Sequence, residues 1–229
     1  EGLKLVKEVS YLDRRKLALN PKTPEALLQE LALDEYEWVR REVASNPNTP
    51  IAALQQLAQD KDWRLREFAI KALVEVASNP NTPIAALQQL AQDKNWDVRR
   101  EVAENPNTSE ETLQQLALDE DEDVRRGVPY NPNTSEETLQ QLAQDEDWSV
   151  RLGVALNRNT PKALLRKLAL DKNEYVRGGV ASNPNTPKEA LQQLALNKNE
   201  YVRQGVASNP NTPVSTLQQL ALDKNEYVR

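Results

Sequence analysis

The chain has 229 residues, a formal net charge of −6 and 38% hydrophobic residues, and it contains no cysteine, histidine or methionine. Without cysteine or histidine it cannot form a disulfide framework, a Ser-His-Asp triad, a thiol nucleophile or the usual zinc and iron–sulfur ligand sets. We therefore expect no enzyme, no metal and no cofactor. Its uncharged stretches are far shorter than the ~18 apolar residues of a membrane span, which predicts a soluble protein, cytoplasmic by default.

A sequence repeat occupies most of the chain. Its first motif, Asn-Pro-Asn-Thr or a close variant, starts at Asn20, Asn46, Asn79, Asn105, Asn131, Asn157, Asn183 and Asn209. The starts are 26 residues apart except for one interval of 33. A period of roughly 20–50 residues is typical of solenoids, whose units bury their apolar faces only against neighbours. We therefore predict eight tandem repeats over residues 20–229, the last one truncated, after an N-terminal cap or partial repeat over residues 1–19.

The first helix of each repeat is predicted to begin at the threonine of this motif. In the repeat starting at Asn79, Thr82 is an expected N-cap and Pro83 the first helical residue. In two repeats a serine and two glutamates follow the threonine, a spacing that suggests a capping box. Leu87, Leu90 and Ala91 then lie on one helical face.

A second short helix is predicted over roughly 96–103, because Val98, Val102 and Ala103 again share one face. The Asn-Pro pair that follows ends it, since a residue before proline is driven out of the α conformation. In four repeats a glycine precedes the second valine, which weakens an α-helix by about 1 kcal/mol each. We therefore expect partial 3₁₀ character in this helix.

The pattern N-P-N-T-(P/S)-x-x-x-L-x-x-L-A-x-D-x-x-x-x-V-R-x-x-V-A resembles the leucine-rich repeat variant family, which is related in shape to HEAT repeats. The resemblance covers about residues 20–229. It implies an all-α fold, a right-handed superhelical solenoid of short helix pairs, and a binding scaffold rather than an enzyme. Some family members carry a cysteine-rich iron–sulfur segment before the repeats, but residues 1–19 contain no cysteine.

The 33-residue interval carries seven extra residues between Trp63 and Ser78. Because seven residues make about two helical turns, we expect the insertion to lengthen the second helix of that repeat and to keep its phase.

Two polar features recur in nearly every repeat. The paired asparagines of the linkers are expected to bond backbone groups of their own and neighbouring turns. An aspartate also stands six residues before the arginine of Val-Arg, and HEAT-like repeats suggest that such pairs link helix ends within and between repeats. On this spacing Asn197 stands opposite Arg203, so we expect Arg203 to lack a carboxylate partner. This expected structural ladder includes Asp93, Arg99, Asp119, Arg125, Asp145, Arg151, Asp171 and Arg177.

The acidic run Asp119-Glu120-Asp121-Glu122-Asp123 resembles the start of a calcium-binding loop. Its sixth position is Val124 and its twelfth is Tyr130, where an EF-hand requires glycine and glutamate. We interpret it as a solvated turn whose carboxylates favour the start of the next helix.

A ligand-specific surface should lie where the copies differ. Trp148, Leu152 and Leu156 form one stripe of a predicted second helix, and Tyr130 stands one repeat earlier at the position equivalent to Leu156. These four residues are the candidate partner-binding surface. The competing interpretation, which we favour, is local packing onto the next linker, where Arg158 replaces proline.

The charge pattern favours a protein or peptide partner, and a basic one. Residues 105–156 carry a clear acidic excess, whereas residues 157–182 are basic. No basic stripe of the kind that binds a phosphate backbone is present, and the tryptophans occupy two registers relative to Val-Arg, which argues against nucleic acid.

The leading functional prediction is a non-enzymatic repeat scaffold that binds proteins or peptides. The alternatives are a designed or consensus-like scaffold without a natural ligand and a HEAT-like nucleic-acid binder. At the C-terminal repeat, we expect Leu217, Leu220 and Val228 to be uncovered. That face predicts either weak tail-to-tail self-association or fraying after about Asn209.

Overall fold

The computed structural model describes residues 9–229, and its contacts divide the chain into two units, residues 1–107 and 108–229. Within the described residues every regular element is a helix and no strand occurs, so the all-α prediction is confirmed. The first eight residues of the predicted N-terminal cap lie outside the described range.

The helices have the following bounds. The first unit contains α2 (Tyr11–Leu19), α3 (Glu25–Leu31), α4 (Glu37–Ser45), α5 (Ile51–Leu57), α6 (Trp63–Ser78), α7 (Ile84–Leu90) and α8 (Trp96–Glu104). The second unit contains α9 (Glu110–Leu116), α10 (Glu122–Gly127), the 3₁₀-helix η1 (Val128–Tyr130), α11 (Glu136–Leu142), α12 (Trp148–Leu156), α13 (Lys162–Leu168), α14 (Glu174–Ser182), α15 (Lys188–Leu194), α16 (Glu200–Ser208) and α17 (Val214–Leu220).

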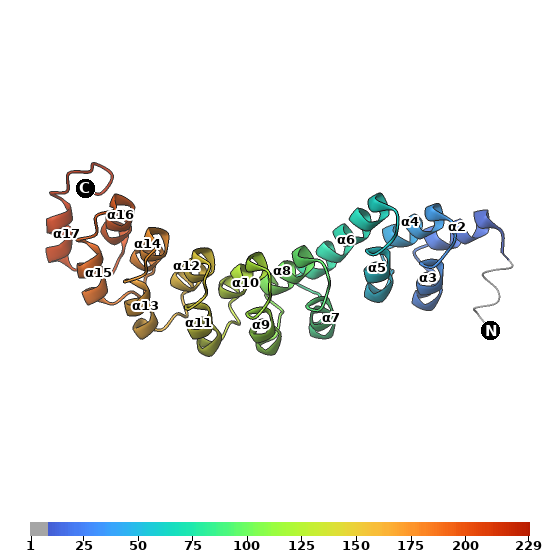
Figure 1. Cartoon of the computed structure of the whole chain (residues 1–229), viewed down its shortest axis with the longest axis horizontal. Coiled ribbons are helices and arrows are strands. Elements are labelled where there is room, and N and C mark those ends of the chain that lie inside the picture. Colours follow the sequence, from blue (N-terminus) through green and yellow to red (C-terminus); the bar gives the residue numbers. More distant parts are fainter. Residues whose placement is uncertain (1–8) are drawn as a thin grey trace. The chain divides into compact units, whose positions relative to one another are not determined.

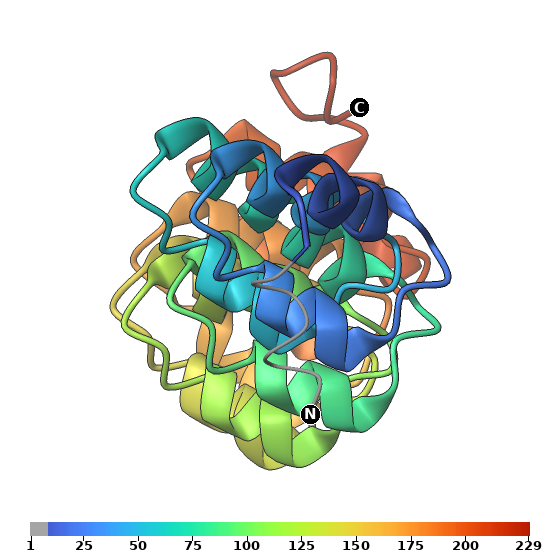
Figure 2. The same cartoon turned by 90° about the vertical axis from the view of Figure 1, so that its right-hand side faces the viewer.

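Each unit is a stack of helix pairs in two layers (Figure 1). Consecutive second helices contact each other extensively: α2, α4, α6 and α8 in the first unit, and α10, α12, α14 and α16 in the second. The first helices of the repeats form the other layer. Within each unit the helices of one layer follow one behind another in the end-on view (Figure 2).

The core of each unit lies between these layers. Every first helix from α3 to α15 buries two leucines three residues apart, such as Leu87 and Leu90, and most second helices bury two valines four residues apart, such as Val98 and Val102. Burying a leucine fully contributes about 1.5–3 kcal/mol. The apolar periodicity predicted for both helices is therefore the periodicity of the core.

The predicted threonine caps are wrong. In most repeats the N-cap is the following proline, such as Pro83, and it makes no side-chain cap bond. In α9 and α11 the cap is serine, and Ser109 Oγ accepts the N–H of Thr112 in place of the expected glutamate pairing. The threonine of the motif instead donates backwards: Thr82 Oγ1 bonds the carbonyl oxygen of Val76 at 2.6 Å. It therefore satisfies the last turn of the preceding helix, where carbonyl groups lack helical partners.

The predicted 3₁₀ character of the second helix is also wrong for all but one of the described copies. The glycine-containing helices α12, α14 and α16 are α-helical over nine residues each. Only α10 gives way to a 3₁₀ segment, and this segment contains Pro129. Proline lacks the N–H of an i to i−4 bond and its ring clashes with the preceding turn, so proline rather than glycine changes the helix type.

The insertion lies in α6, which has 16 residues where α4 and α8 have nine each. The buried side chains Leu65, Ala69, Leu73 and Ala77 recur every four residues along it. One helical face therefore stays on the core through the two extra turns.

The linker asparagines form a second repeating contact, as predicted. Asn209 is buried, and its Nδ2 donates to the carbonyl oxygens of Ala181 at 2.6 Å and Asn183 at 2.8 Å, one repeat earlier. Its Oδ1 accepts the N–H of Asn211 at 2.9 Å. Asn46, Asn105 and Asn183 make the same pair of bonds. We call this series the asparagine ladder.

The C-terminal repeat is only partly open. Leu217 is exposed, but Leu220 and Val228 are buried, so the predicted uncovered face is wrong for two of its three residues. Self-association through this repeat stays a prediction. Separately, none of the helices in residues 9–229 combines the length and apolarity needed to cross a bilayer.

Candidate protein-binding surface

The aspartates and arginines singled out in the sequence form ion pairs between consecutive repeats. Nε of Arg151 lies 2.7 Å from Oδ2 of Asp171, and Nη2 lies 3.0 Å from Oδ1. Arg40 with Asp60, Arg125 with Asp145, and Arg203 with Asp223 repeat this two-point contact over the same separation of 20 residues. Arginine suits this geometry because its planar fork matches a carboxylate. We call these pairs the arginine ladder.

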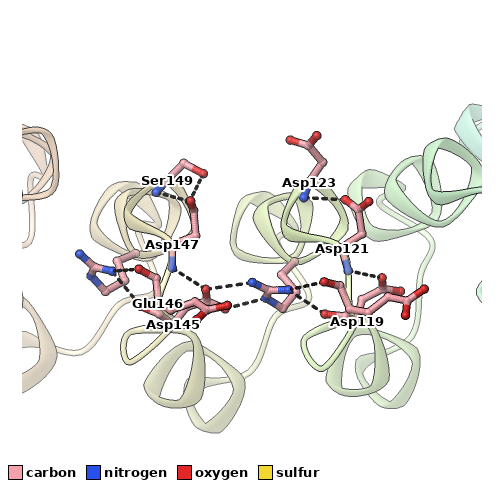
Figure 3. A network of polar contacts seen from close by, with 10 residues as sticks. Asp119, Asp121, Asp123, Asp145, Glu146, Asp147 and Ser149 are labelled. Carbon is pink, nitrogen blue, oxygen red and sulfur yellow. Dashed lines mark hydrogen bonds and ion pairs between the residues drawn. The ribbon is translucent and has the colours of Figure 1, made fainter.

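Within its own repeat each arginine binds backbone rather than a carboxylate. Nη1 of Arg125 donates to the carbonyl oxygens of Asp119 at 2.8 Å and Glu120 at 3.1 Å (Figure 3). The six-residue spacing therefore corresponds to a contact between the helix and the backbone of the turn before it.

This geometry corrects the expectation for Asn197. Arg203 has a carboxylate partner, Asp223, and it is Arg177, 20 residues before Asn197, that lacks one. Nε of Arg177 is buried without a hydrogen-bond partner, while its Nη1 keeps the carbonyl bonds to Asp171 and Lys172.

The repeat interface at the long helix departs from the pattern as well. The carboxylate of Asp93 accepts Nε2 of Gln55 at 2.9 Å, and among the described residues no carboxylate pairs with Arg66. Arg99 Nη1 donates to the carbonyl oxygen of Asp93 at 2.9 Å. The seven extra residues therefore break the 20-residue spacing on which a regular pair depends.

The ladder shifts the acidity of its members. The hydrogen bond that Arg125 donates to Asp145 raises the pKa of Arg125, and the bond that Arg151 donates to Asp171 raises the pKa of Arg151. Burial alone would raise the pKa of Asp171, but the bonds from Arg151 and from the N–H of Asn173 outweigh it, so its pKa is lowered. Both charges are thus favoured at neutral pH.

We expect the Asp223 carboxyl to titrate near pH 2, because the bonds from Arg203 and from the N–H of Asn225 lower its pKa to about 2. An unfolded aspartate titrates near pH ~3.9. The pair therefore stabilises the fold above that pH, and the contribution is lost as the pH falls through about 2. Carboxyl-detected NMR should show this midpoint, and Arg203→Gln should move it towards ~3.9. An unchanged midpoint in Arg203→Gln would remove Arg203 as the cause.

Asn197→Asp should stabilise the chain by about 1–3 kcal/mol, because it gives the buried Nε of Arg177 a charged acceptor. Asn199→Asp is the matched control. It adds the same charge two residues away, at a cap position where other repeats carry aspartate. Urea unfolding of the two variants measures the difference. Equal stabilities would show that Arg177 needs no carboxylate.

The acidic run of residues 119–123 serves as a turn and a helix start. Oδ1 of Asp119 accepts the N–H of Asp121, and Oδ1 of Asp121 accepts the N–H of Asp123 (Figure 3). In the next repeat the corresponding turn is built in the same way by Asp145 and Asp147, with Ser149 bonded to Asp147. These carboxylates are thus engaged with backbone N–H groups at the start of α10 and α12.

The four predicted partner-binding residues lie on the layer of second helices in the second unit. Tyr130, Trp148 and Leu156 are exposed and Leu152 is half-buried. A Cβ placed on Gly179 would lie 2.7 Å from Cδ1 of Leu152, and one on Gly153 would lie 3.3 Å from Cε2 of Tyr130. Leu152 and Tyr130 therefore pack against glycines of the next second helix. Packing onto the linker at Arg158 stays a prediction.

Trp148 belongs to a row of aromatic rings that crosses three repeats. Its ring centroid lies 5.2 Å from that of Tyr175, which lies 6.0 Å from that of Tyr201. The three residues are 40%, 49% and 48% exposed. Centroid separations of 4.5–7 Å are those of interacting rings. We call Trp148, Tyr175 and Tyr201 the aromatic row.

Sequence reasoning missed Tyr175 and Tyr201. The signal was present, since both tyrosines occur in the segment Glu-Tyr-Val-Arg and Gly178 follows the first copy. A Cβ on Gly178 would lie 2.3 Å from Cε1 of Tyr201, so the missing side chain gives that ring its place. The difference in register between Trp148 and the tyrosines does not separate the rings, since the centroids of Trp148 and Tyr175 lie 5.2 Å apart.

The tryptophans of the first unit are arranged differently. Trp38, Trp63 and Trp96 each lie beside an arginine of their own helix, at 5.3–5.5 Å from guanidinium carbon to ring centroid. Such contacts are worth about 0.5–1 kcal/mol at exposed sites. No aromatic pair joins these three rings among the described residues.

Comparison with known proteins agrees with this architecture. Residues 24–105 match the HEAT repeat family and residues 96–121 match the leucine rich repeat variant family. No curated protein sequence matches the chain. A solved structure described as a leucine-rich repeat variant with a novel repetitive structural motif is similar over 94% of this chain and 83% of its own, with 25% identity and a TM-score of 0.64.

Two further solved structures are more distant. An engineered protein covers 99% of this chain and 85% of its own, with 17% identity and a TM-score of 0.40. A designed armadillo repeat protein in complex with the peptide (KR)4 covers 100% and 95%, with 17% identity and a TM-score of 0.26. The likeness of fold therefore rests on the leucine-rich repeat variant structure. Repeat families of this kind are generally non-enzymatic scaffolds, and this chain is a helical repeat protein whose repeats match those of the HEAT and leucine-rich repeat variant families.

Proposed function

We propose that the second unit is a scaffold that binds a protein or peptide through the aromatic row and the adjoining side chains of Tyr130, Leu152 and Leu156. The observation that carries this proposal is the row itself. Three half-exposed rings, one from each of α12, α14 and α16, lie in contact on one layer of the unit.

Such a row has the composition of a binding hot spot. Tryptophan and tyrosine supply large contact areas at a small cost in side-chain entropy, and they are enriched among residues that dominate interface energies. The rings are already held in place by packing on Gly178 and by one another, so a partner meets a preorganised surface.

The charges around the row favour a peptide over a phosphate backbone. The turn before α12 carries Asp145, Glu146 and Asp147, and a glutamate directly precedes each tyrosine. Lys172 and Lys198 lie in the turns before α14 and α16, so the acidic character is strongest towards α10 and α12. We therefore expect a largely apolar partner segment with basic residues at its α10–α12 end.

The experiment places a photocrosslinking amino acid at Tyr201 and, as a control, at Trp96 in the first unit. A protein crosslinked from nuclease-treated lysate at Tyr201 but not at Trp96 is then purified, and its affinity is measured. Trp148→Ala and Tyr201→Ala should weaken binding at least ~30-fold each, the effect of a hot-spot residue worth ~2 kcal/mol or more. Trp96→Ala should have little effect.

Two results would refute the proposal. In the first, capture at Tyr201 disappears after nuclease treatment, which assigns the surface to nucleic acid. In the second, the purified partner binds Trp148→Ala and Tyr201→Ala as tightly as the unchanged chain.

A further inference from the structure

The insertion in α6 opens a cleft in the first unit. The cleft has a volume of about 440 Å³ and lies between the end of α4 and the long helix α6. Its lining includes Ala44, Asn46, Phe68, Lys71, Glu75 and Asn79. No equivalent long helix occurs elsewhere in the described residues, because the other second helices have at most nine residues.

The asparagine ladder is interrupted at this cleft. In a regular rung, Nδ2 of Asn105 reaches the carbonyl oxygens of Ala77 and Asn79, 28 and 26 residues earlier. The corresponding donor for Ala44 would be an asparagine at the start of the next linker. That residue, Asn79, is exposed and its side chain only accepts the N–H of Asn81.

The acceptors of the missing rung are therefore left open. Among the described residues no hydrogen bond reaches the carbonyl oxygen of Ala44, although this residue is only 3% exposed. The carbonyl oxygen of Asn46 accepts only the N–H of Thr49, the bond that each regular linker also makes. A polar group in this position needs a partner or water, since an unmet buried acceptor costs about 1–3 kcal/mol.

The walls of the cleft suit a peptide rather than a small ion. Phe68 is 40% exposed and supplies an apolar wall, while Lys71 and Glu75 place one charge of each sign on the same side of α6. Two N–H groups on one nitrogen, which a primary carboxamide provides, can meet both open acceptors at once. Every intact rung of the ladder fills the same pair of acceptors with an asparagine carboxamide.

We infer that the cleft binds an asparagine-bearing turn of a partner protein, whose carboxamide takes the place of the missing rung. The turn would donate from its Nδ2 to the carbonyl oxygens of Ala44 and Asn46 and rest an apolar residue on Phe68. This site lies in the first unit and depends on none of the residues of the aromatic row, so the two proposals stand or fail separately.

The chain supplies its own probe. The heptapeptide VASNPNT occurs at residues 43–49, 76–82, 180–186 and 206–212, and it contains the asparagine that fills a rung. The acetylated and amidated peptide is titrated into the full chain and followed by amide NMR. We expect weak binding with shifts confined to residues near 44–48 and 68–79. The peptide VASDPNT, whose carboxylate cannot donate, should bind at least tenfold more weakly.

Two variants locate the site. Deletion of residues 68–74 leaves the sequence WRLREEVASN, which has the spacing of a regular repeat, and it should close the rung and abolish binding. Phe68→Ala should lower the affinity for the peptide several-fold. This variant tests the apolar wall of the cleft even if the deletion variant does not fold. Trp96→Ala, which removes a similarly exposed ring from the same unit, is the control and should bind as the unchanged chain does.

Equal binding of the asparagine and aspartate peptides, shifts outside the cleft, or no binding at millimolar peptide would each overturn the inference. Self-association of the chain that is lost on deletion of residues 68–74 would also overturn it, because the occupant would then be a second copy of this chain rather than a partner protein.

Discussion

Arg151→Ala is expected to lower the free energy of unfolding by about 3–5 kcal/mol, whereas Arg177→Ala should cost much less. The two arginines occupy the same position in consecutive repeats and make the same backbone bonds. Arg151 donates to the carbonyl oxygens of residues 145 and 146, and Arg177 donates to those of residues 171 and 172. They differ in that Arg151 pairs with the carboxylate of Asp171, whereas the Nε of Arg177 has no hydrogen-bond partner. Removing Arg151 leaves Asp171 charged with its side chain 10% exposed, while removing Arg177 leaves no buried charge behind.

Urea unfolding of both variants, combined with amide exchange across α12–α15, measures this difference. Amide exchange is needed because neighbouring repeats can unfold separately, so that a single cooperative unfolding transition cannot be assumed. Equal losses in the two variants would mean that the backbone bonds, and not the ion pair, account for the role of these arginines.

The second large effect is expected in the leucine core. Leu191→Ala should cost about 2–5 kcal/mol, because it empties a fully buried site between the layers. Leu217 is its equivalent one repeat later and is 38% exposed, against 0% for Leu191. Leu217→Ala should therefore cost about half as much or less, since part of its surface already faces water.

Thermal unfolding compares these two leucine variants directly. A loss at Leu217 as large as that at Leu191 would show that the last repeat is covered in solution, as the predicted tail-to-tail association requires. The dependence of the melting temperature on protein concentration then separates association from a rearrangement within one chain.

The helices and the core could be predicted from sequence because they depend on local periodicity. Leu87 and Leu90 share a face by helical geometry alone, and the repeat length fixes how often that face returns. The long helix α6 follows from the same rule, since seven residues keep the phase of the helix. The interruption of the asparagine ladder by this helix could not be predicted from the same rule, because that contact depends on where the following linker lies in the fold.

The partners of the arginines could not be predicted from spacing. A separation of six residues suggests a pair within one repeat, but there the contact is with a carbonyl oxygen. The ion pair spans 20 residues and is set by the displacement from one repeat to the next. For this reason the six-residue spacing pairs Asn197 with Arg203, whereas the 20-residue spacing pairs it with Arg177, whose Nε is buried without a hydrogen-bond partner.

The candidate surface was only partly visible for a similar reason. Leu152 and Leu156 stand out because their copies are mostly charged or small, whereas the tyrosines recur and look structural. The absence of a side chain at Gly178 leaves the space that the Tyr201 ring occupies. The described glycines have no positive φ, so their role is space rather than backbone conformation. A glycine at such a position is informative only when its neighbour in the next repeat is known.

Wherever the arginine ladder is intact, one repeat is held to the next by the arginine of the first and the carboxylate of the second. A double-mutant cycle between Arg151 and Asp171, with Arg151 and Asp145 as the comparison, tests it most directly. We expect a coupling free energy of about 2 kcal/mol for the first pair and less than ~0.5 kcal/mol for the second, because Arg151 bonds only the backbone of Asp145. A coupling to Asp145 as large as that to Asp171 would contradict it.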